Sequence, residues 1–331
     1  MLRPVDRVEV TVVVDNALDL LSTVPDSVTA ELPNDLAAGA AEMSGPSVCC
    51  AAWGLSLEVS ATVGEERHKV LFDGGPEGWA FERNAKRLGV ARGAVEAVAL
   101  SHGHWDHAGG LPAAIASVHA ANGGRPVPTH VNPGMFVKRG LRLSDERILP
   151  FGDVPSVEEL ERAGASMVND PAPRSLGSET FFLSGEIPRV TTYEKGLPRQ
   201  VKLGPEGSWI PDPLVLDERF LAVHVKDAGI VVFSSCSHAG VVNVLTHARG
   251  IFAPLPLYAV FGGLHLSGAA NEGWIDDTVR DLAPFDLQRI VPGHCTGWRA
   301  LHRLIDAFGG AVVPGAVGQT HRLGAGHSLT T

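Results

Sequence analysis

The chain has 331 residues, of which 44% are hydrophobic and 19% charged, so it can bury the core of one large domain or two small ones. The net charge of −10 argues against a nucleic-acid partner, because proteins that grip a phosphate backbone need a basic face. No apolar stretch approaches the roughly 20 residues that span a bilayer, so we expect no membrane partner.

The N-terminus and the cysteines indicate where the protein works. The first residues lead into a strand pattern without the apolar core of a signal peptide. The four cysteines, two of them adjacent at Cys49 and Cys50, do not resemble a disulfide framework. These features predict a cytoplasmic protein.

The first part of the chain predicts a sheet followed by alternating helices and strands. A long loop with a short helix is expected at residues 15–48, after the first strand. Period-two apolar patterns mark strands and 3.6-residue spacing marks helices. The predicted strands are 8–14, 55–63, 69–72 and 95–100, and the predicted helices are 79–88, ending at Gly89, and 111–121.

The last part repeats this alternation, which predicts an α/β fold with two sheet-and-helix halves. Its predicted strands are 220–225, 230–234, 257–261 and 287–291, and its helices are 241–248, 275–282 and 296–308. The middle, at about 140–217, is richer in Pro, Arg and Glu. We expect it to be an inserted segment that covers the site of a single domain spanning 1–331.

A dense group of metal-competent side chains follows the strand 95–100. Residues 101–107 read Ser-His-Gly-His-Trp-Asp-His. Residues two apart in an extended segment project to one side, so His102 and His104 can close on one ion, while Asp106 and His107 face a second. Imidazole with carboxylate is the ligand mix of zinc, or of iron or manganese in an oxygen-richer site. A solvated loop is the alternative, but such density seldom arises without a metal.

Three further histidines, His238, His265 and His294, each follow a predicted strand. Ligands on α/β scaffolds gather beyond the carboxyl ends of strands, so these loops can converge with the first group. His238 and His294 are surrounded by Gly, Ser and Cys, which favours metal ligands. His265 lies between two leucines, and a metal ligand, a substrate contact and a buried histidine are all open for it. Asp73, at another strand end, can orient a ligand histidine from behind.

Two of the cysteines adjoin these histidines. Cys236 and Cys295 lie beside better-placed ligands, so we expect them to pack as small apolar residues.

The pattern His102-x-His104-x-Asp106-His107, followed by His238 and His294 and preceded by Asp73, resembles the metallo-β-lactamase fold superfamily. The resemblance implies an αββα sandwich with the metal site at the edge between the two sheets. It implies one metal on the residues matching His102, His104 and His238, and another on those matching Asp106, His107 and His294. Family members usually carry an aspartate that bridges both metals, and residues 257–266 contain none. One ion, or an unusual second site that uses His265, is therefore open.

A narrower resemblance, over about residues 8–320, is to the dihydropterin–ribofuranosylaminobenzene phosphate synthase-like branch. Trp53 stands where that branch often has a histidine. The peptides that carry the resemblance are 185–189, 193–196, 236–240 with Asn243, 262–266 and 292–297.

These observations predict a metal-dependent hydrolase that acts on a small phosphorylated or ester- or lactone-type substrate through a metal-bound hydroxide. One or two Zn²⁺ ions, or Fe or Mn, would lower the pKa of the water to roughly 7. Asp106 would be the catalytic residue that orients or deprotonates this water. Arg189 and Lys195 would bind a phosphate or carboxylate, or else be ordinary solvated charges. The alternatives are the transfer implied by the branch name and a non-catalytic, metal-dependent ligand sensor.

Overall fold

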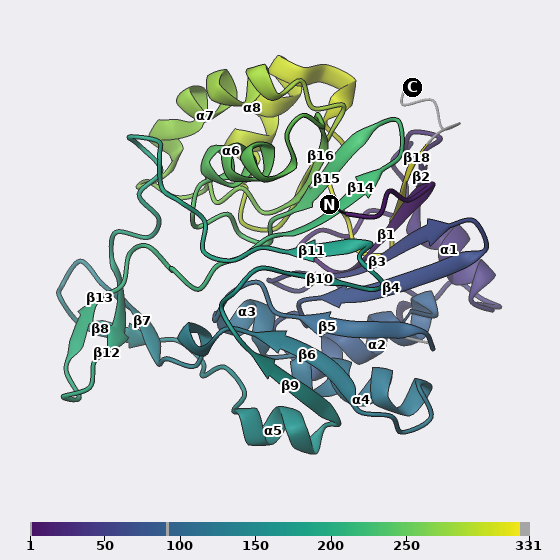
Figure 1. Ribbon diagram of the computed structural model, residues 1–331, viewed down its shortest axis with the longest axis horizontal. Coiled ribbons are helices and arrows are strands. Elements are labelled where there is room, and N and C mark those ends of the chain that lie inside the picture. The colour runs from purple at the N-terminus through teal and green to yellow at the C-terminus, as the bar shows by residue number, and fades with distance from the viewer. Residues whose placement is uncertain (1, 91–92, 325–331) are drawn as a thin grey trace.

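Two β-sheets packed face to face form the centre of the protein, with helices on the outer face of each (Figure 1). The computed structural model describes residues 2–90 and 93–324. In spatial order, the eight-stranded sheet contains β2 (Val28–Thr29), β18 (Thr320–Gly324), β1 (Arg7–Val14), β3 (Ser56–Val63), β4 (Glu66–Phe72), β5 (Val95–Ala99), β6 (Val127–Val131) and β9 (Ala165–Asn169). The six-stranded sheet contains β10 (Arg174–Leu176), β11 (Phe181–Leu183), β14 (Leu221–Val225), β15 (Gly229–Phe233), β16 (Leu257–Gly262) and β17 (Arg289–Pro292).

The α-helices of the described residues are α1 (Glu31–Ala37), α2 (Gly78–Leu88), α3 (Trp105–Ala108), α4 (Leu111–Ala121), α5 (Val157–Arg162), α6 (Val241–Phe252), α7 (Ile275–Leu282) and α8 (Trp298–Phe308). Apolar residues of α2, α4 and α5 pack on the eight-stranded sheet, and those of α6, α7 and α8 pack on the six-stranded sheet. The expected αββα sandwich of the α/β class is therefore confirmed.

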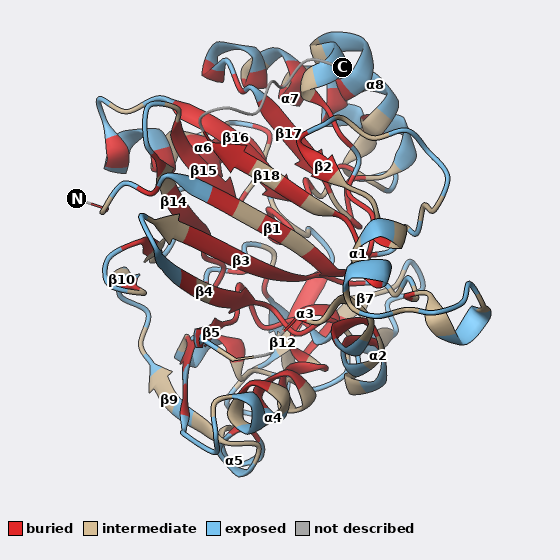
Figure 2. Ribbon diagram, turned by 90° about the vertical axis from the view of Figure 1, so that its right-hand side faces the viewer, coloured by how far each residue is buried: buried red, intermediate tan, exposed pale blue. Residues whose placement is uncertain are grey.

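Side chains alternate between the two faces of each sheet, and this alternation builds the layers. Val70 and Phe72 pack between the sheets, whereas Leu71 packs beneath the helices. In the other sheet, Val231 and Phe233 face the same central core, and Val232 faces the opposite helices. Figure 2 shows the resulting run of buried residues through β3, β4, β15 and β16. Successive side chains in a strand point to opposite faces, so fully apolar strands must be covered on both.

Most predicted elements form where the sequence places them. Helix α2 ends at Gly89, whose φ of 66° is the left-handed conformation expected after a helix. Helix α6 continues to Phe252, beyond the predicted end. Strand β17 begins at Arg289, two residues later than predicted, because Asp286 closes a turn with a φ of 52°.

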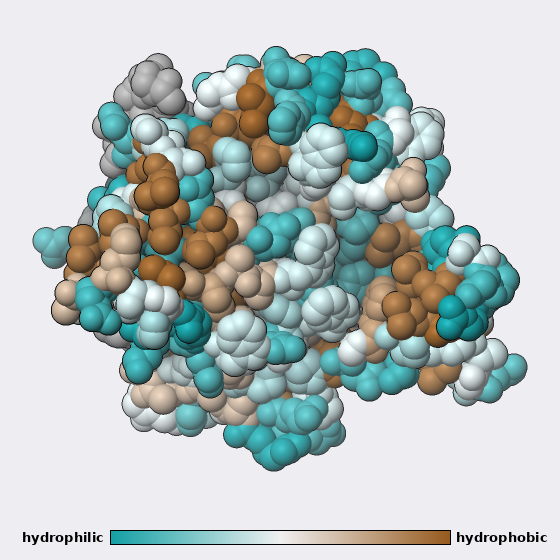
Figure 3. All heavy atoms as spheres, turned by 180° about the vertical axis from the view of Figure 1, so that it is seen from behind, coloured by the Kyte–Doolittle hydropathy of each residue, from teal (hydrophilic) through white to brown (hydrophobic). Residues whose placement is uncertain are grey.

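The middle segment is divided between the main sheets and a separate small sheet. Strands β9, β10 and β11 belong to the two main sheets. The small sheet contains β13 (Trp209–Pro211), β12 (Gln200–Leu203), β7 (Arg139–Arg142) and β8 (Ile148–Pro150). The part of 140–217 that stands outside the sandwich is therefore discontinuous. Figure 3 shows hydrophobic side chains on this small sheet, where Leu149, Leu203 and Ile210 are exposed.

In the residues that the structure describes, every helix is too short or too polar to cross a membrane.

A buried histidine on β18 predicts a loss of stability in acid. His321 is 1% exposed against the ring of Phe261, and neither ring nitrogen has a hydrogen-bond partner. Burial, with a smaller effect of Arg289, lowers the pKa of His321 from 6.5 to about 3. The unfolded chain therefore binds a proton that the folded chain does not, and stability falls as the pH drops from 6.5 toward 3.

The His321→Phe variant should reduce this pH dependence by up to about 1.4 kcal/mol per pH unit. Denaturant unfolding of both proteins between pH 4 and 8 gives the two slopes. If the free energies of unfolding of the two proteins change with pH in parallel, His321 is not buried in its neutral form.

Candidate metal centre

The predicted ligands come together at one edge of the sandwich. They lie in the loops that follow β4, β5, β15 and β17. β4 and β5 are parallel neighbours, as are β15, β16 and β17, so the carboxyl ends within each set lie at the same edge of their sheet. The face-to-face packing then brings the loops of one sheet against those of the other.

Three imidazole nitrogens from both sheets form the first donor group. His102 Nε2 lies 3.1 Å from His104 Nδ1 and 3.1 Å from His238 Nε2. One ring nitrogen carries at most one proton and cannot donate to both partners. Donors on one tetrahedral zinc lie about 3.3–3.6 Å apart, so the spacing fits a shared ion. Burial, with smaller effects of neighbouring histidines and Arg139, lowers the pKa of all three, which leaves them neutral with lone pairs for a metal.

The second donor group lies beside the first. Asp106 Oδ2 is 3.7 Å from His107 Nε2 and 3.8 Å from His294 Nε2. Burial opposes the charged form of His107, but the carboxylates of Asp106 and Asp73 outweigh it and raise its pKa to about 9. A metal entering this group must displace that proton, so metal and proton compete for the same nitrogen. The oxygen and nitrogen donors fit zinc, iron or manganese.

Asp73 connects the second group to both sheets. Its carboxylate accepts hydrogen bonds from Ser101 N (2.7 Å), Ser101 Oγ (2.8 Å) and Ser235 Oγ, and its Oδ2 lies 2.7 Å from His107 Nδ1. The side chain is fully buried. It therefore fixes the ring of His107 with Nε2 directed at the donor group, which is the role expected for an outer carboxylate.

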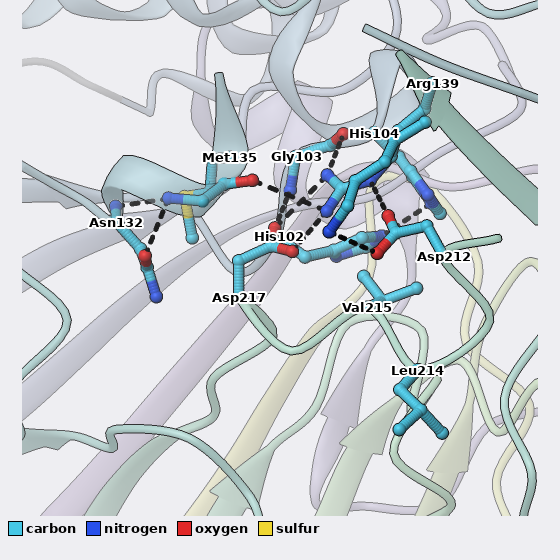
Figure 4. A network of polar contacts seen from close by, with 12 residues as sticks. His102, Gly103, His104, Asn132, Met135, Arg139, Asp212, Leu214, Val215 and Asp217 are labelled. Carbon is cyan, nitrogen blue, oxygen red and sulfur yellow. Dashed lines mark hydrogen bonds and ion pairs between the residues drawn. The ribbon is translucent and has the colours of Figure 1, made fainter. Parts of the chain in front are cut away.

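A network of charged residues holds the peptide between His102 and His104 (Figure 4). Gly103 N donates to Asp217 Oδ2 (2.8 Å), and Arg139 Nη1 donates to Gly103 O (2.9 Å). Arg139 also bonds Asp217 and, through Nε, Asp212 Oδ2 (2.9 Å). A Cβ at position 103 would lie 2.3 Å from the carbonyl oxygen of Met135, so only glycine fits. Since Arg139 belongs to β7, the small sheet supports the ligand loop directly.

The other ligand loop is held by a buried carboxylate. Glu218 accepts hydrogen bonds from His238 N (2.8 Å) and Ala239 N (2.6 Å). It comes from the segment just before β14, and its two oxygens fix the backbone that carries His238.

A small pocket, with a cavity volume of about 40 Å³, opens beside the first donor group. His238, His265, Lys195, Tyr193 and Trp274 are among its lining residues. The ring of His265 lies 4.5 Å from that of His238, and its Nδ1 has no hydrogen-bond partner. The structure thus places His265 and Lys195 at the pocket.

Arg189, the other expected substrate contact, lies elsewhere. It donates to the backbone carbonyls of Ile187, Leu214 and Val215, and it does not line this pocket. Its Nη atoms tie two loop segments together, whereas Nε has no hydrogen-bond partner, and its substrate-binding role stays a prediction.

Cys236 was expected to be a packing residue, yet it lies among the metal-competent nitrogens. Its Sγ is 3.2 Å from both His107 Nε2 and His294 Nε2. The signal for it is the two-residue spacing from His238, the same spacing that identified His102 and His104. No such spacing marks the supporting residues Arg139, Asp217 and Glu218, because they bond to backbone atoms of loops that are distant in the sequence.

The comparisons with known proteins agree with this geometry. A family model described as the metallo-beta-lactamase superfamily matches residues 58–188. The chain is 29% identical, over 77% of its length and 84% of the relative, to 7,8-dihydropterin-6-methyl-4-(β-D-ribofuranosyl)-aminobenzene-5′-phosphate synthase of Methanocaldococcus jannaschii. It is 28% identical, over 74% of its length and 86% of the relative, to an uncharacterized protein of the same organism.

A solved structure has the same fold. Tm1679, described as a metal-dependent hydrolase of the β-lactamase superfamily, aligns with a TM-score of 0.67 and 22% identity. The alignment covers 96% of this chain and 98% of that one. At this level of identity the likeness concerns the fold.

Proposed function

We propose that this chain, which matches the metallo-beta-lactamase superfamily model over residues 58–188, is a member of that superfamily, holds metal in its two donor groups and hydrolyses a small phosphorylated or ester- or lactone-type substrate. The observation that carries this proposal is the pair of adjacent donor groups beside a pocket lined by one lysine, Tyr193 and Trp274. Zinc is the proposed metal, since imidazole nitrogen dominates the donor set; iron and manganese are the alternatives.

The metal ion, Asp106 and His265 have different proposed roles in the reaction. A bound ion of this kind activates water and polarises a substrate oxygen. Asp106 directs Oδ2 toward His107 and His294, and we assign its second oxygen to orienting the attacking water and accepting its proton. His265, at the pocket wall beside His238, is placed to contact the substrate.

The pocket indicates the kind of substrate. The rings of Tyr193 and Trp274 lie 5.9 Å apart at a 30° angle and provide a flat apolar surface. The exposed Lys195 provides a positive charge at the same pocket. The cavity volume is only about 40 Å³, so we expect a small substrate of which only a part enters the pocket. Together these features suit an organic phosphate or carboxylate with a flat ring.

A transfer reaction is the second candidate. It is favoured by the similarity to the synthase of Methanocaldococcus jannaschii over most of both chains. In such a reaction the centre would stabilise a leaving or enolate oxygen in place of activating water.

An assay of the metal-loaded protein separates these candidates. Phosphodiesters, lactones and thioesters test hydrolysis, and the dihydropterin and ribofuranosyl phosphate pair tests transfer. Turnover of a hydrolysable substrate, abolished by Asp106→Ala, is the expected result. Turnover of the pterin pair alone would overturn the hydrolase proposal. Tight ligand binding with no turnover of any compound would indicate a sensor.

Lys195→Ala should raise KM for a phosphorylated substrate by about 10- to 100-fold with little change in kcat, because a charge contact worth about 1.5–3 kcal/mol is lost equally from the ground and transition states. The matched control is Lys226→Ala, which removes an exposed lysine from the β14–β15 turn, at the opposite end of these strands from the ligand loops. An uncharged substrate analogue should show no change in KM with either variant. An equal rise in KM for both substrates would contradict the assignment.

A further inference from the structure

We propose that Cys236 is a metal ligand whose thiolate lies between the two donor groups and binds both ions. The inference rests on the metal centre of the proposed function and is independent of the reaction that the centre performs.

The position of the sulfur supports this role first. Cys236 Sγ lies 3.2 Å from His107 Nε2 and 3.2 Å from His294 Nε2, both in the second group. Sulfur and nitrogen bound to one tetrahedral zinc are about 3.5 Å apart, given bond lengths of about 2.3 and 2.1 Å. The two distances therefore fit a sulfur that shares an ion with both histidines.

The same sulfur also belongs to the first group. Cys236 Sγ and nitrogens of His102 and His238 all lie within 4.8 Å of one another. Among the described residues, Cys236 is the one that joins the candidate set around Asp106 and the candidate set around His102. A donor shared by two adjacent ligand sets is in position to bridge them.

The surroundings of Cys236 favour a metal ligand over a residue kept for apolar packing. Its sulfur can donate one proton to one imidazole and accept weakly from the other, and its lone pairs are the ones that a metal ion would use. The side chain is 2% exposed, and its two closest polar contacts are ring nitrogens that face the donor groups. A cysteine kept for apolar packing would have no reason to face two metal-competent nitrogens.

The neighbouring Cys295 is a natural competitor for this role and serves as the control. Its Sγ contacts the carbonyl oxygen of Cys236 at 3.5 Å. It shares a candidate set with His265 and Cys236, but with none of the histidines of the two donor groups and not with Asp106. Substitution of Cys295 therefore removes a buried thiol at nearly the same place without removing the proposed bridge.

X-ray absorption of the intact zinc protein tests the bridge without any substitution. With two zinc ions per chain, the expected result is an average of one sulfur per zinc at about 2.3 Å, with a zinc–zinc vector of about 3.5–4 Å. Half a sulfur per zinc would show a thiolate on one ion only and overturn the bridge. Absence of sulfur scattering, or binding of a single zinc ion, would overturn it as well.

Cobalt-substituted variants identify the cysteine. The sulfur-to-cobalt charge-transfer absorption should vanish in Cys236→Ala and persist in Cys295→Ala, under reducing conditions. Cys236→Ala should also lose about one ion per chain, while Cys236→Asp should keep two ions without the sulfur absorption. Loss of the absorption in Cys295→Ala alone would assign the ligand to Cys295 and overturn the proposal. These readouts do not involve turnover, so a protein without hydrolase activity could still confirm the bridge.

Discussion

Replacing Asp73 with alanine should lower the free energy of unfolding by about 3–5 kcal/mol and weaken metal binding at the second donor group by about 10- to 100-fold. The fully buried carboxylate accepts bonds from Ser101 and Ser235 and contacts His107 Nδ1. Alanine would leave these buried groups unpaired, and the raised pKa of His107 would lose one of its causes. The ring of His107 would also be free to turn away from the centre.

Urea unfolding and a competitive metal titration measure the two effects. Asp73→Asn keeps the size of the side chain and one acceptor oxygen, so it should cost less stability than alanine. Asp153→Ala removes an exposed carboxylate paired with Lys138 and should change stability by no more than about 1 kcal/mol. An Asp73→Ala protein as stable as the Asp153→Ala protein would contradict the role of Asp73.

The second large effect is expected for His102→Ala. Loss of a residue that only orients a metal ligand lowers activity by up to roughly 100-fold, so loss of the ligand His102 itself should lower activity by more than that. His102 Nε2 contacts both His104 and His238, so its removal breaks the first donor group at its centre. The core between the sheets is built from other side chains, so the variant should remain folded.

Circular dichroism and metal analysis distinguish loss of the site from loss of the fold. His302→Ala, on the exposed face of α8, is the matched histidine control and should keep full metal content and activity. Retention of activity by a folded His102→Ala protein would show that the centre lies elsewhere.

The histidine loops could be predicted from the sequence because each directly follows a strong apolar run. The strands before His238 and His294 are buried throughout, and the one before His102 is buried except at Glu96, so the apolar runs are clear and their carboxyl ends can be located. Strands of three residues, such as β10 and β11, are too short to show a period. For this reason the middle segment looked like one insertion.

The supporting residues could not be predicted, since they depend on contacts between distant parts of the chain. Arg139 and Asp217 are 78 residues apart and meet only because the small sheet folds against the loop of Gly103. The Nη atoms of Arg189 bond backbone carbonyls that no sequence pattern reveals, and its contact with substrate stays a prediction. The two-residue spacing from His238 marks Cys236 as a candidate, but only the fold shows that His107 and His294 converge on its sulfur.

The metal content of the purified protein tests the central claim most directly. Elemental analysis after purification without chelators should find about two ions per chain in the wild type, and His102→Ala should hold fewer. Absence of bound metal in the wild type, or unchanged metal content in His102→Ala, would contradict the assignment of these histidines to a metal centre.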